Sequence, residues 1–194
     1  MATTTLPKTG CEASGHSGLP RHAPNNTGGS DTSAILGIDP GLDGALAFLR
    51  SDGGLEVFDM PVHRLQRGGK AKREIDLYEL ARIVDAHGPI TRAFVELVGA
   101  MPGQGVSSTF QFGRSLGIVE GVLSAGFIPT DYVAPRRWRT TMGVRDGKDG
   151  SRARASALMP SCAGLWTRVK DDGRAEAVLI ALYGQRLIAR EARS

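Results

Sequence analysis

Short apolar runs set the pattern of the first part of the chain. Residues 34–39 form such a run and end in Asp-Pro-Gly, which is typical of a buried strand followed by a turn. Residues 45–49 and 55–58 repeat the pattern, and the Ser-Asp-Gly-Gly stretch at 51–54 between them has the composition of a hairpin turn. This part of the chain therefore predicts three antiparallel strands.

Helical and strand-like segments alternate in the rest of the chain. Asp76 is placed to cap a helix, because a carboxylate accepts hydrogen bonds from the free N–H groups at a helix start, and Gly88-Pro89 ends that helix. Residues 64–73 are rich in Gly, Lys and Arg and predict an exposed loop. The further elements are predicted as helix, strand, helix, strand and three helices, at 76–86, 92–98, 107–125, 127–133, 135–139, 151–158 and 172–189. This order indicates an α/β domain with a mixed sheet.

Three glycines recur at a spacing of four in the predicted helix 107–125. Gly113, Gly117 and Gly121 fall on one helical face and remove side-chain bulk there. Such a face permits close packing, either against the protein's own sheet or against a second copy of the chain.

The N-terminal segment differs in composition from the rest. Residues 1–33 are mostly Thr, Ser, Gly, Pro and Asn, which cannot bury enough apolar surface to fold, so we expect a disordered tail before one folded domain at 34–190. A targeting peptide is the alternative, and the lack of an apolar stretch argues against secretion. The two cysteines, Cys11 and Cys162, lie far apart and imply no disulfide framework.

Basic residues gather late in the chain. The net charge is only +4, yet ten Lys and Arg residues lie between positions 136 and 174, against four acids. Such clustering is the electrostatic footprint expected for a polyanionic partner, with an ordinary solvated surface as the alternative. The chain has no apolar run long enough for a bilayer, no Cys/His cluster at zinc-ligand spacing and no Walker A sequence. A membrane span, a zinc site and a P-loop ATPase are therefore not expected.

Two acids stand at or near the ends of predicted strands. Asp39 ends the first strand, and Glu96 follows Phe94 and Val95 in an apolar run. Ligands bind beyond the carboxyl ends of parallel strands, and a buried acid is costly unless it is paired or binds a metal. If the two strands are parallel neighbours, the carboxylates meet at one edge and a divalent cation relieves their repulsion. For Asp39 alone, a turn carboxylate that accepts backbone N–H bonds is the alternative.

A second pair of acids opens the last predicted helix. Asp172 and Glu176 are four residues apart, so they face the same way, and Glu176 lies beside the apolar stripe of the helix. An exposed first turn with ordinary acidic bias is the alternative. With Asp39 and Glu96 they make four carboxylates, which suit Mg²⁺ because this ion prefers oxygen ligands. Two such ions about 3.5–4 Å apart can activate a water and stabilise the leaving oxygen of a phosphodiester.

These motifs resemble those of RuvC-type Holliday junction resolvases, over about residues 34–187. The matching stretches are Ile35-Leu-Gly-Ile-Asp-Pro-Gly41 with Gly44-Ala45, Val95-Glu96 and Gly173-Arg-Ala-Glu-Ala177. The phage-like and chloroplast branch is the most similar, through Lys148-Asp149, Ser151-Arg152 and Tyr183-Gly184. The resemblance implies an RNase H-like fold with a mixed five-stranded sheet flanked by helices. It also implies a homodimer, two Mg²⁺ ions per active site with Mn²⁺ as a substitute, and paired symmetric nicks in four-way junction DNA.

The resemblance also implies roles for individual residues. Asp39, Glu96, Asp172 and Glu176 match the catalytic, metal-binding acids, with Asp171 as a local competitor of Asp172. Bacterial RuvC spaces its last two acids three apart, whereas here the spacing is four. The residue that opens the junction has no clear counterpart, and Met101 and Phe110 are the candidates. The DNA-binding candidates are Lys148, Arg152, Arg154, Arg136, Arg137 and Arg139, with a solvated surface as the alternative for each. Trp138 is expected in the core.

The leading hypothesis is a Holliday junction resolvase, located in the cytoplasm at the nucleoid, with an organelle such as the chloroplast as the alternative. A related nuclease that cuts RNA–DNA hybrids or other branched DNA shares the same acids. A junction-binding protein without catalysis is disfavoured, because clustered acids do not help to bind phosphate. A sugar-kinase or actin-like ATPase is disfavoured because the chain is too short for its two lobes.

Overall fold

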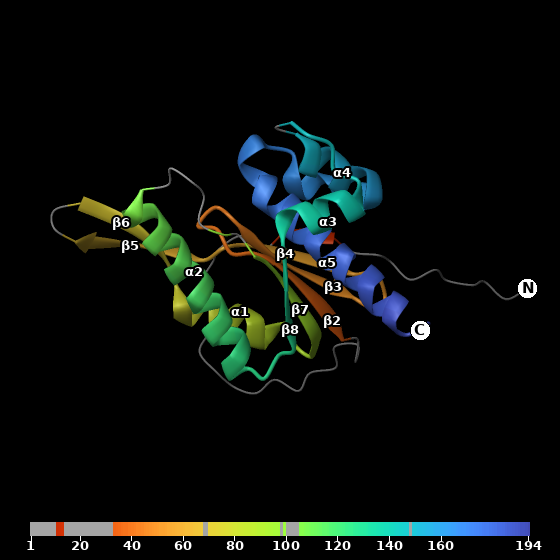
Figure 1. Ribbon diagram of the computed structural model, residues 1–194, viewed down its shortest axis with the longest axis horizontal. Helices are drawn as coiled ribbons and strands as arrows, with labels where there is room; N and C mark the ends of the chain where they lie inside the picture. Colours follow the sequence, from red (N-terminus) through yellow and green to blue (C-terminus); the bar gives the residue numbers. More distant parts are fainter. Residues whose placement is uncertain (1–10, 14–32, 68–69, 98, 100–104, 148) are drawn as a thin grey trace, which may run out of the picture.

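Six strands form one mixed sheet in the computed structural model, which describes residues 11–13, 33–67, 70–97, 99, 105–147 and 149–194 (Figure 1). The spatial order is β1-β4-β3-β2-β7-β8. Strands β2, β3 and β4 form an antiparallel meander. On the other side of β2, β7 pairs with β2 in parallel, and β8 pairs with β7 in parallel. The strands are β1 (Cys11–Ala13), β2 (Ala34–Asp39), β3 (Ala45–Arg50), β4 (Leu55–Asp59), β7 (Ile90–Glu96) and β8 (Thr130–Val133).

The five strands predicted from the apolar runs are present, and β1 adds a sixth at one edge. β1 lies within the segment predicted as a tail and pairs in parallel with β4. The other residues of 1–32 lie outside the described part of the chain.

Cys162 is disulfide-bonded in the structure, so the expectation that the cysteines imply no disulfide was wrong.

Helices cover both faces of the sheet and create two hydrophobic cores (Figure 1). α1 and α2 cover one face, and α5 covers the other together with α3, α4 and a 3₁₀ turn, η1. The helical bounds are α1 (Leu77–Ala86), α2 (Val106–Ala125), α3 (Pro135–Met142), α4 (Gly150–Leu158), η1 (Pro160–Trp166), η2 (Val169–Asp171) and α5 (Asp172–Glu191). The capping role predicted for Asp76 is confirmed, because its Oδ1 accepts hydrogen bonds from two N–H groups of α1.

Strand β2 lies at the centre of the sheet and separates the two cores. Leu36 and Ile38 point to the α1–α2 side, whereas Gly37 faces α5, as the alternation of a strand requires. A Cβ at Gly37 would lie 2.2 Å from the carbonyl oxygen of Ala177 and 2.4 Å from the backbone nitrogen of Ala181. The absence of a side chain thus lets the backbone of α5 pack directly against β2.

Residues 64–73 do not form the loop predicted from their composition. Strands β5 (Val62–Arg67) and β6 (Lys70–Ile75) pair as a separate two-stranded antiparallel sheet, which extends beside α2 in Figure 1. Most of the surface of these two strands is not covered by a hydrophobic core, and they carry many charged residues. The alternation of apolar and polar residues that predicts strands elsewhere is therefore missing here. Pairing between the strands and burial of Glu74 and Ile75 at the base define the hairpin instead.

The glycines of α2 point away from the sheet. In the described part of the chain, no atom lies within 4 Å of a Cβ placed at Gly113, Gly117 or Gly121, while Val119 and Leu123 provide the buried face of the helix. Packing of the glycine face against the protein's own sheet is therefore excluded. Across the described residues, no helix combines the length and the apolar character needed to cross a membrane.

Candidate active site

Asp39 and Glu96 end two neighbouring strands at the same edge of the sheet. β2 and β7 run parallel with Ile38 opposite Val95, so the next residue of each strand is an acid. Asp39 Oδ1 accepts a hydrogen bond from the N–H of Gly41 at 3.0 Å, as a turn carboxylate would. Burial nevertheless raises the pKa of Asp39 to about 6, despite that hydrogen bond, and the negative charges of Glu176 and Asp172 add to the rise.

Glu96 is buried next to a tryptophan. The indole N–H of Trp138 in α3 donates to Glu96 Oε1 at 2.9 Å, and Trp138 itself is fully buried, as predicted. Burial raises the pKa of Glu96 to about 7, the hydrogen bond from Trp138 opposes the rise, and the charges of Asp39 and Glu176 contribute to it. Burial thus disfavours the charged form of Glu96, and shifts of this kind are frequent at functional sites.

Glycines allow the start of α5 to approach the turn after β2. A Cβ at Gly173 would lie 2.4 Å from the carbonyl oxygen of Asp43, 2.8 Å from Cα of Gly44 and 3.2 Å from Asp39 Oδ2. No side chain fits in that space without moving backbone. The first turn of α5 is thus held against Asp39, which brings the acids of α5 to the sheet edge.

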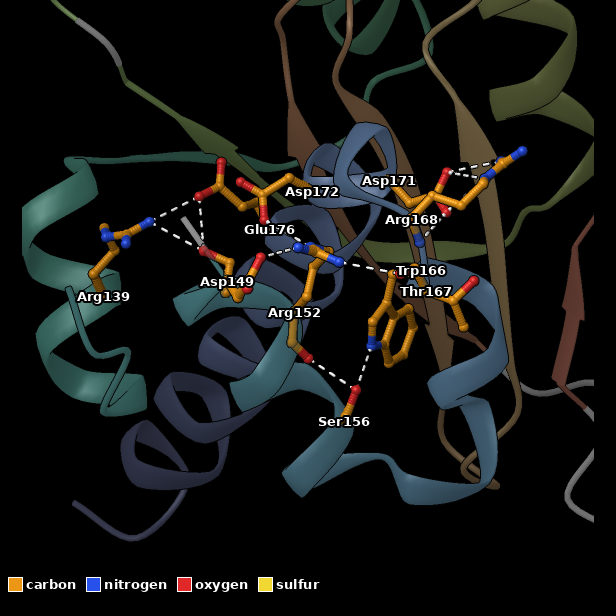
Figure 2. Close-up of polar contacts among 11 residues, drawn as sticks. Arg139, Asp149, Arg152, Ser156, Trp166, Thr167, Arg168, Asp171, Asp172 and Glu176 are labelled. Atoms are coloured by element: carbon orange, nitrogen blue, oxygen red, sulfur yellow. Dashed lines mark hydrogen bonds and ion pairs between the residues drawn. The ribbon is translucent and has the colours of Figure 1, made fainter. Parts of the chain in front are cut away.

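Glu176 lies in the second turn of α5 and is held by two polar side chains. Its Oε1 accepts hydrogen bonds from Arg139 of α3 at 2.7 Å and from Ser151 of α4 at 2.9 Å. Burial raises the pKa of Glu176, the Ser151 and Arg139 contacts oppose the rise, and the charge of Asp172 adds to it. Figure 2 shows Arg139 directed at Glu176 from a separate helix.

The structure separates Asp172 from its neighbour Asp171. Asp171 is turned away and accepts hydrogen bonds from the guanidinium and the backbone N–H of Arg168, which lower its pKa (Figure 2). Asp172 instead contributes to the raised pKa values of Asp39 and Glu176. Asp172 is therefore the acid that shares the cluster, and Asp171 closes the turn before α5.

Arg152 lies beside Asp172 without a full hydrogen bond. Its guanidinium donates to Asp149 and to the carbonyl oxygen of Thr167, and its Nε lies 3.8 Å from Asp172 Oδ1. This separation is too long for a hydrogen bond. Among the described residues, Arg152 Nε and Asp172 Oδ1 are the buried side-chain atoms without a hydrogen-bond partner. Burial raises the pKa of Asp172, and the charges of Arg152 and Arg139 oppose the rise.

The acid cluster has the chemistry of a cation site but not a preformed coordination sphere. Within the described residues, no three acids, histidines or cysteines are already arranged around a common point. Asp39 accepts from the backbone N–H of Gly41, and the other three carboxylates are turned toward Trp138, Arg139, Ser151 and Arg152. The oxygen donors, the raised pKa values and the lack of a hydrogen bond at Asp172 Oδ1 all fit a hard divalent cation.

The basic residues predicted to bind DNA fall into three groups. Arg139 and Arg152 lie in the acid cluster, and Arg136 and Arg137 are exposed on α3. Arg154 is half-buried and donates through Nε to the carbonyl oxygen of Met142 at the end of α3. Lys148 and Met101 lie outside the described residues. Phe110, the other junction-opening candidate, is exposed on α2.

Three partners of the acids were not foreseen as such. Trp138 was predicted as core, and its hydrogen bond to Glu96 was missed. Ser151 was only part of a motif, and Arg139 was considered for DNA rather than for Glu176. Of these contacts, the one between Trp138 and Glu96 was the most predictable. A buried indole N–H needs an acceptor, and Glu96 was expected to be a buried acid.

Comparisons with known proteins identify the fold. No protein-family model matches the chain. Thermus thermophilus RuvC, solved in complex with a Holliday junction substrate, superimposes with a TM-score of 0.50 at 16% identity, covering 81% of this chain and 96% of that one. The yeast mitochondrial Holliday junction resolvase Ydc2 gives a TM-score of 0.52 at 14% identity, covering 82% of each chain. The chain therefore has the RuvC-like, RNase H-like fold predicted from its sequence.

A curated relative supports the resemblance at the level of sequence. The chloroplastic Holliday junction resolvase MOC1 of Chlamydomonas reinhardtii is 29% identical to this chain. The match covers 66% of this chain and 17% of the relative, so this chain spans only a small part of that protein's length. The resemblance to RuvC-type resolvases, including a chloroplast protein, is thus confirmed.

Proposed function

We propose that this chain is a divalent-metal-dependent endonuclease that resolves four-way DNA junctions by paired symmetric nicks. The observation that carries the proposal is the convergence of Asp39, Glu96, Asp172 and Glu176 from two strands and a helix into one partly buried cluster. Desolvated acids that raise one another's pKa values are unfavourable for folding, and a cation removes that cost. The names of the relatives supply the junction as substrate.

The four acids would hold Mg²⁺, two ions per active site, with Mn²⁺ as a substitute. When bound, the ions would supply an activated water and stabilise the charge on the leaving oxygen. The protein's own contribution is to hold the acids close together. Trp138 orients Glu96, and the Arg139–Ser151 pair orients Glu176. Gly173 keeps Asp172 within reach of Asp39.

Basic side chains around the cluster would position the scissile phosphate. Arg152 and Arg139 lie at its border, where a guanidinium can pair with a phosphate once metal has neutralised the acids. Arg136 and Arg137, exposed on α3, would contact the DNA backbone further out. Lys148 and Arg154 complete the proposed DNA-binding set, although Arg154 also ties α4 to the end of α3.

A homodimer would provide the two active sites that paired nicks need. The uncovered glycine face of α2 supports this assembly, because the absence of side chains at Gly113, Gly117 and Gly121 lets a second helix approach closely. For location, we propose the cytoplasm at the nucleoid. The chloroplastic relative supports an organelle as the alternative.

The test compares DNA cleavage by the wild type and by Asp39→Asn. Purified protein is incubated with labelled four-way junction, linear duplex, flap and RNA–DNA hybrid, with Mg²⁺ or with EDTA. The matched control is Asp52→Asn, because Asp52 accepts the same kind of turn hydrogen bond, from Gly54 at 2.9 Å, but is exposed and remote from the cluster.

We expect symmetric nicks in the junction that need Mg²⁺, a loss of at least about a hundredfold in Asp39→Asn, and unchanged activity in Asp52→Asn. Equal cutting of linear duplex would refute junction selectivity and favour a general nuclease. Preferential cutting of the hybrid would favour the RNase H-like alternative. Full activity of Asp39→Asn, or in EDTA, would refute the acid cluster as the active site.

A further inference from the structure

The ion pair between Arg174 and Asp59 joins the first turn of α5 to the end of β4. Arg174 Nε donates to Asp59 Oδ1 at 2.5 Å, and Arg174 Nη2 donates to Asp59 Oδ2 at 2.6 Å. The remaining arm of the guanidinium, Nη1, donates to the carbonyl oxygen of Leu165 in η1 at 3.2 Å. Two parallel bonds between a planar guanidinium and a carboxylate fix orientation as well as distance. Arg174 is therefore attached to two other segments in one defined geometry.

Asp59 lies at the same edge of the sheet as Asp39. In the strand register Asp39 is opposite Ala45, and Ala45 is opposite Asp59. Neighbouring strands are about 4.8 Å apart, so about 10 Å separates the two acids. The N–H of Met60 donates to the carbonyl oxygen of Gly44 at 2.9 Å, which ties the end of β4 to the turn after β2. Asp59 is thus a fixed point beside that turn.

The first turn of α5 is not fixed by a capping side chain of its own. Asp171 occupies the N-cap position, and its side chain makes no capping hydrogen bond to α5. Gly173 permits the close approach to the turn after β2, but a glycine offers no side chain that could hold the helix there. Arg174 is the next residue, and its ion pair supplies the attachment that the cap and the glycine do not.

The place of Arg174 on the helix couples its ion pair to the acids. Successive helical residues are rotated by about 100°, so Asp172 and Glu176 lie on the side of α5 opposite to Arg174. Side chains extend about 5–6 Å from a helix axis, so a rotation of about 10° moves each carboxylate by about 1 Å. A misplacement of about 1 Å can lower the rate of an enzyme by about a hundredfold. Small rotations of this turn therefore matter for the cluster.

We propose that Arg174, through its ion pair with Asp59, is a positioning residue that sets the rotation of the first turn of α5 and so the place of Asp172 relative to Asp39. The proposal deepens the proposed function and rests on it for the reaction that the acids perform. Stability does not explain the pair, because the side chain of Asp59 is 59% exposed and ion pairs with an exposed partner contribute little to folding. Breaking the pair should therefore change activity far more than stability.

The test compares Arg174→Lys and Arg174→Gln with the wild type. Lys keeps the charge but cannot form two parallel bonds to a carboxylate, and Gln removes the charge. The matched control is Arg82→Lys. Arg82 forms the same kind of two-bond pair with Glu79, at 2.8 and 2.5 Å, on α1, which covers the opposite face of the sheet. The measurements are kcat and KM for cleavage of a labelled four-way junction, the affinity for Mn²⁺ without DNA, and the thermal midpoint.

We expect both Arg174 variants to lower kcat by about tenfold to a hundredfold, with KM within about twofold of the wild type. Affinity for Mn²⁺ should fall about tenfold, as it does when residues that orient metal ligands are changed. The thermal midpoint should fall by less than about 3 °C. Arg82→Lys should match the wild type in all of these measurements.

Three results would overturn the proposal. Wild-type kcat in Arg174→Lys would mean that charge alone suffices. A raised KM with unchanged kcat would mean that Arg174 binds the substrate instead of positioning the acids. A fall in the thermal midpoint well beyond about 3 °C, together with the loss of activity, would give Arg174 a purely structural role.

A second variant reaches the same pair from β4. Asp59→Asn keeps the shape of the side chain, removes its charge and leaves α5 unchanged in sequence. Because both substitutions break one ion pair, Asp59→Asn combined with Arg174→Lys should lose no more activity than the worse single variant. Losses that multiply would show that the two residues act independently and would also overturn the proposal.

This proposal and the proposed function can fail separately. If the wild type cuts junctions and Arg174→Lys cuts them equally well, the nuclease proposal stands and the positioning role of Arg174 is wrong. If the wild type cuts no junction but Arg174→Lys binds Mn²⁺ more weakly than the wild type and Arg82→Lys do, Arg174 positions the acids and the proposed function is wrong.

Discussion

Replacing Asp39 by Asn should stabilise the metal-free protein while it abolishes cleavage. Burial and the neighbouring acids raise the pKa of Asp39 from 3.8 to about 6 in the folded state. A shift of about two units corresponds to roughly 3 kcal/mol of unfavourable free energy once the group is ionised. Asn is nearly isosteric, carries no charge, and its Oδ1 can still accept the hydrogen bond from the N–H of Gly41.

The pH dependence follows from the direction of the shift. Because the folded protein binds the Asp39 proton more tightly than the unfolded chain, stability is fully present below pH 3.8 and is lost as the pH rises through about 6. Above that pH Asp39 is ionised in the folded protein, and its full electrostatic cost lowers the free energy of unfolding. The advantage of the Asn variant should therefore be small at pH 4 and reach its maximum at pH 8.

The assay is urea and thermal unfolding in EDTA at pH 4, 6 and 8. At pH 8 we expect Asp39→Asn to raise the free energy of unfolding by about 1–3 kcal/mol, or the thermal midpoint by roughly 3–10 °C. Asp52→Asn, the exposed control, should change neither. Adding Mg²⁺ should stabilise the wild type and not the variant, because ligand binding to the folded state alone adds stability. An Asn variant that is no more stable than the wild type at pH 8 would refute the reasoning.

Two further substitutions test how the cluster is held. Trp138→Phe keeps the aromatic packing but removes the N–H donated to Glu96, so the pKa of Glu96 should rise and the acidic limb of the cleavage pH profile should move upward; an unmoved limb in a folded variant contradicts this role. Gly173→Ala places a Cβ 2.4 Å from the carbonyl oxygen of Asp43 and should shift the start of α5, lowering kcat by about a hundredfold. Gly164→Ala, whose Cβ meets nothing within 4 Å, is the control, and equal kcat values for both variants would show that close approach is unimportant.

The acids were predictable because their signal is local. An apolar run that ends in an acid, as at Asp39 and Glu96, indicates both a buried strand and an unusual charge within a few residues. Once β2 and β7 are placed as parallel neighbours, the two acids lie at the same edge of the sheet. The pair in α5 followed in the same way from helical spacing and from the apolar stripe beside Glu176.

The parts that sequence reasoning missed depend on contacts between distant segments. Whether Arg139 holds a phosphate or Glu176 is decided by how α3 packs near α5, and nothing near Arg139 in the sequence indicates that packing. The β5–β6 hairpin was missed because its strands lack apolar alternation, and β1 because a three-residue strand gains most of its order from its partner. Composition predicted where the charge lies but not the backbone that presents it.

The direct contact between α5 and β2 has a consequence for how activity appears during folding. The cluster joins residue 39 to residue 176, so a long loop must close before Gly37 can meet the backbone of α5. Closing so long a loop is slow, and contacts of this separation form late. Partly folded chains therefore hold isolated acids, and the proposed nicking activity should arise together with the native state.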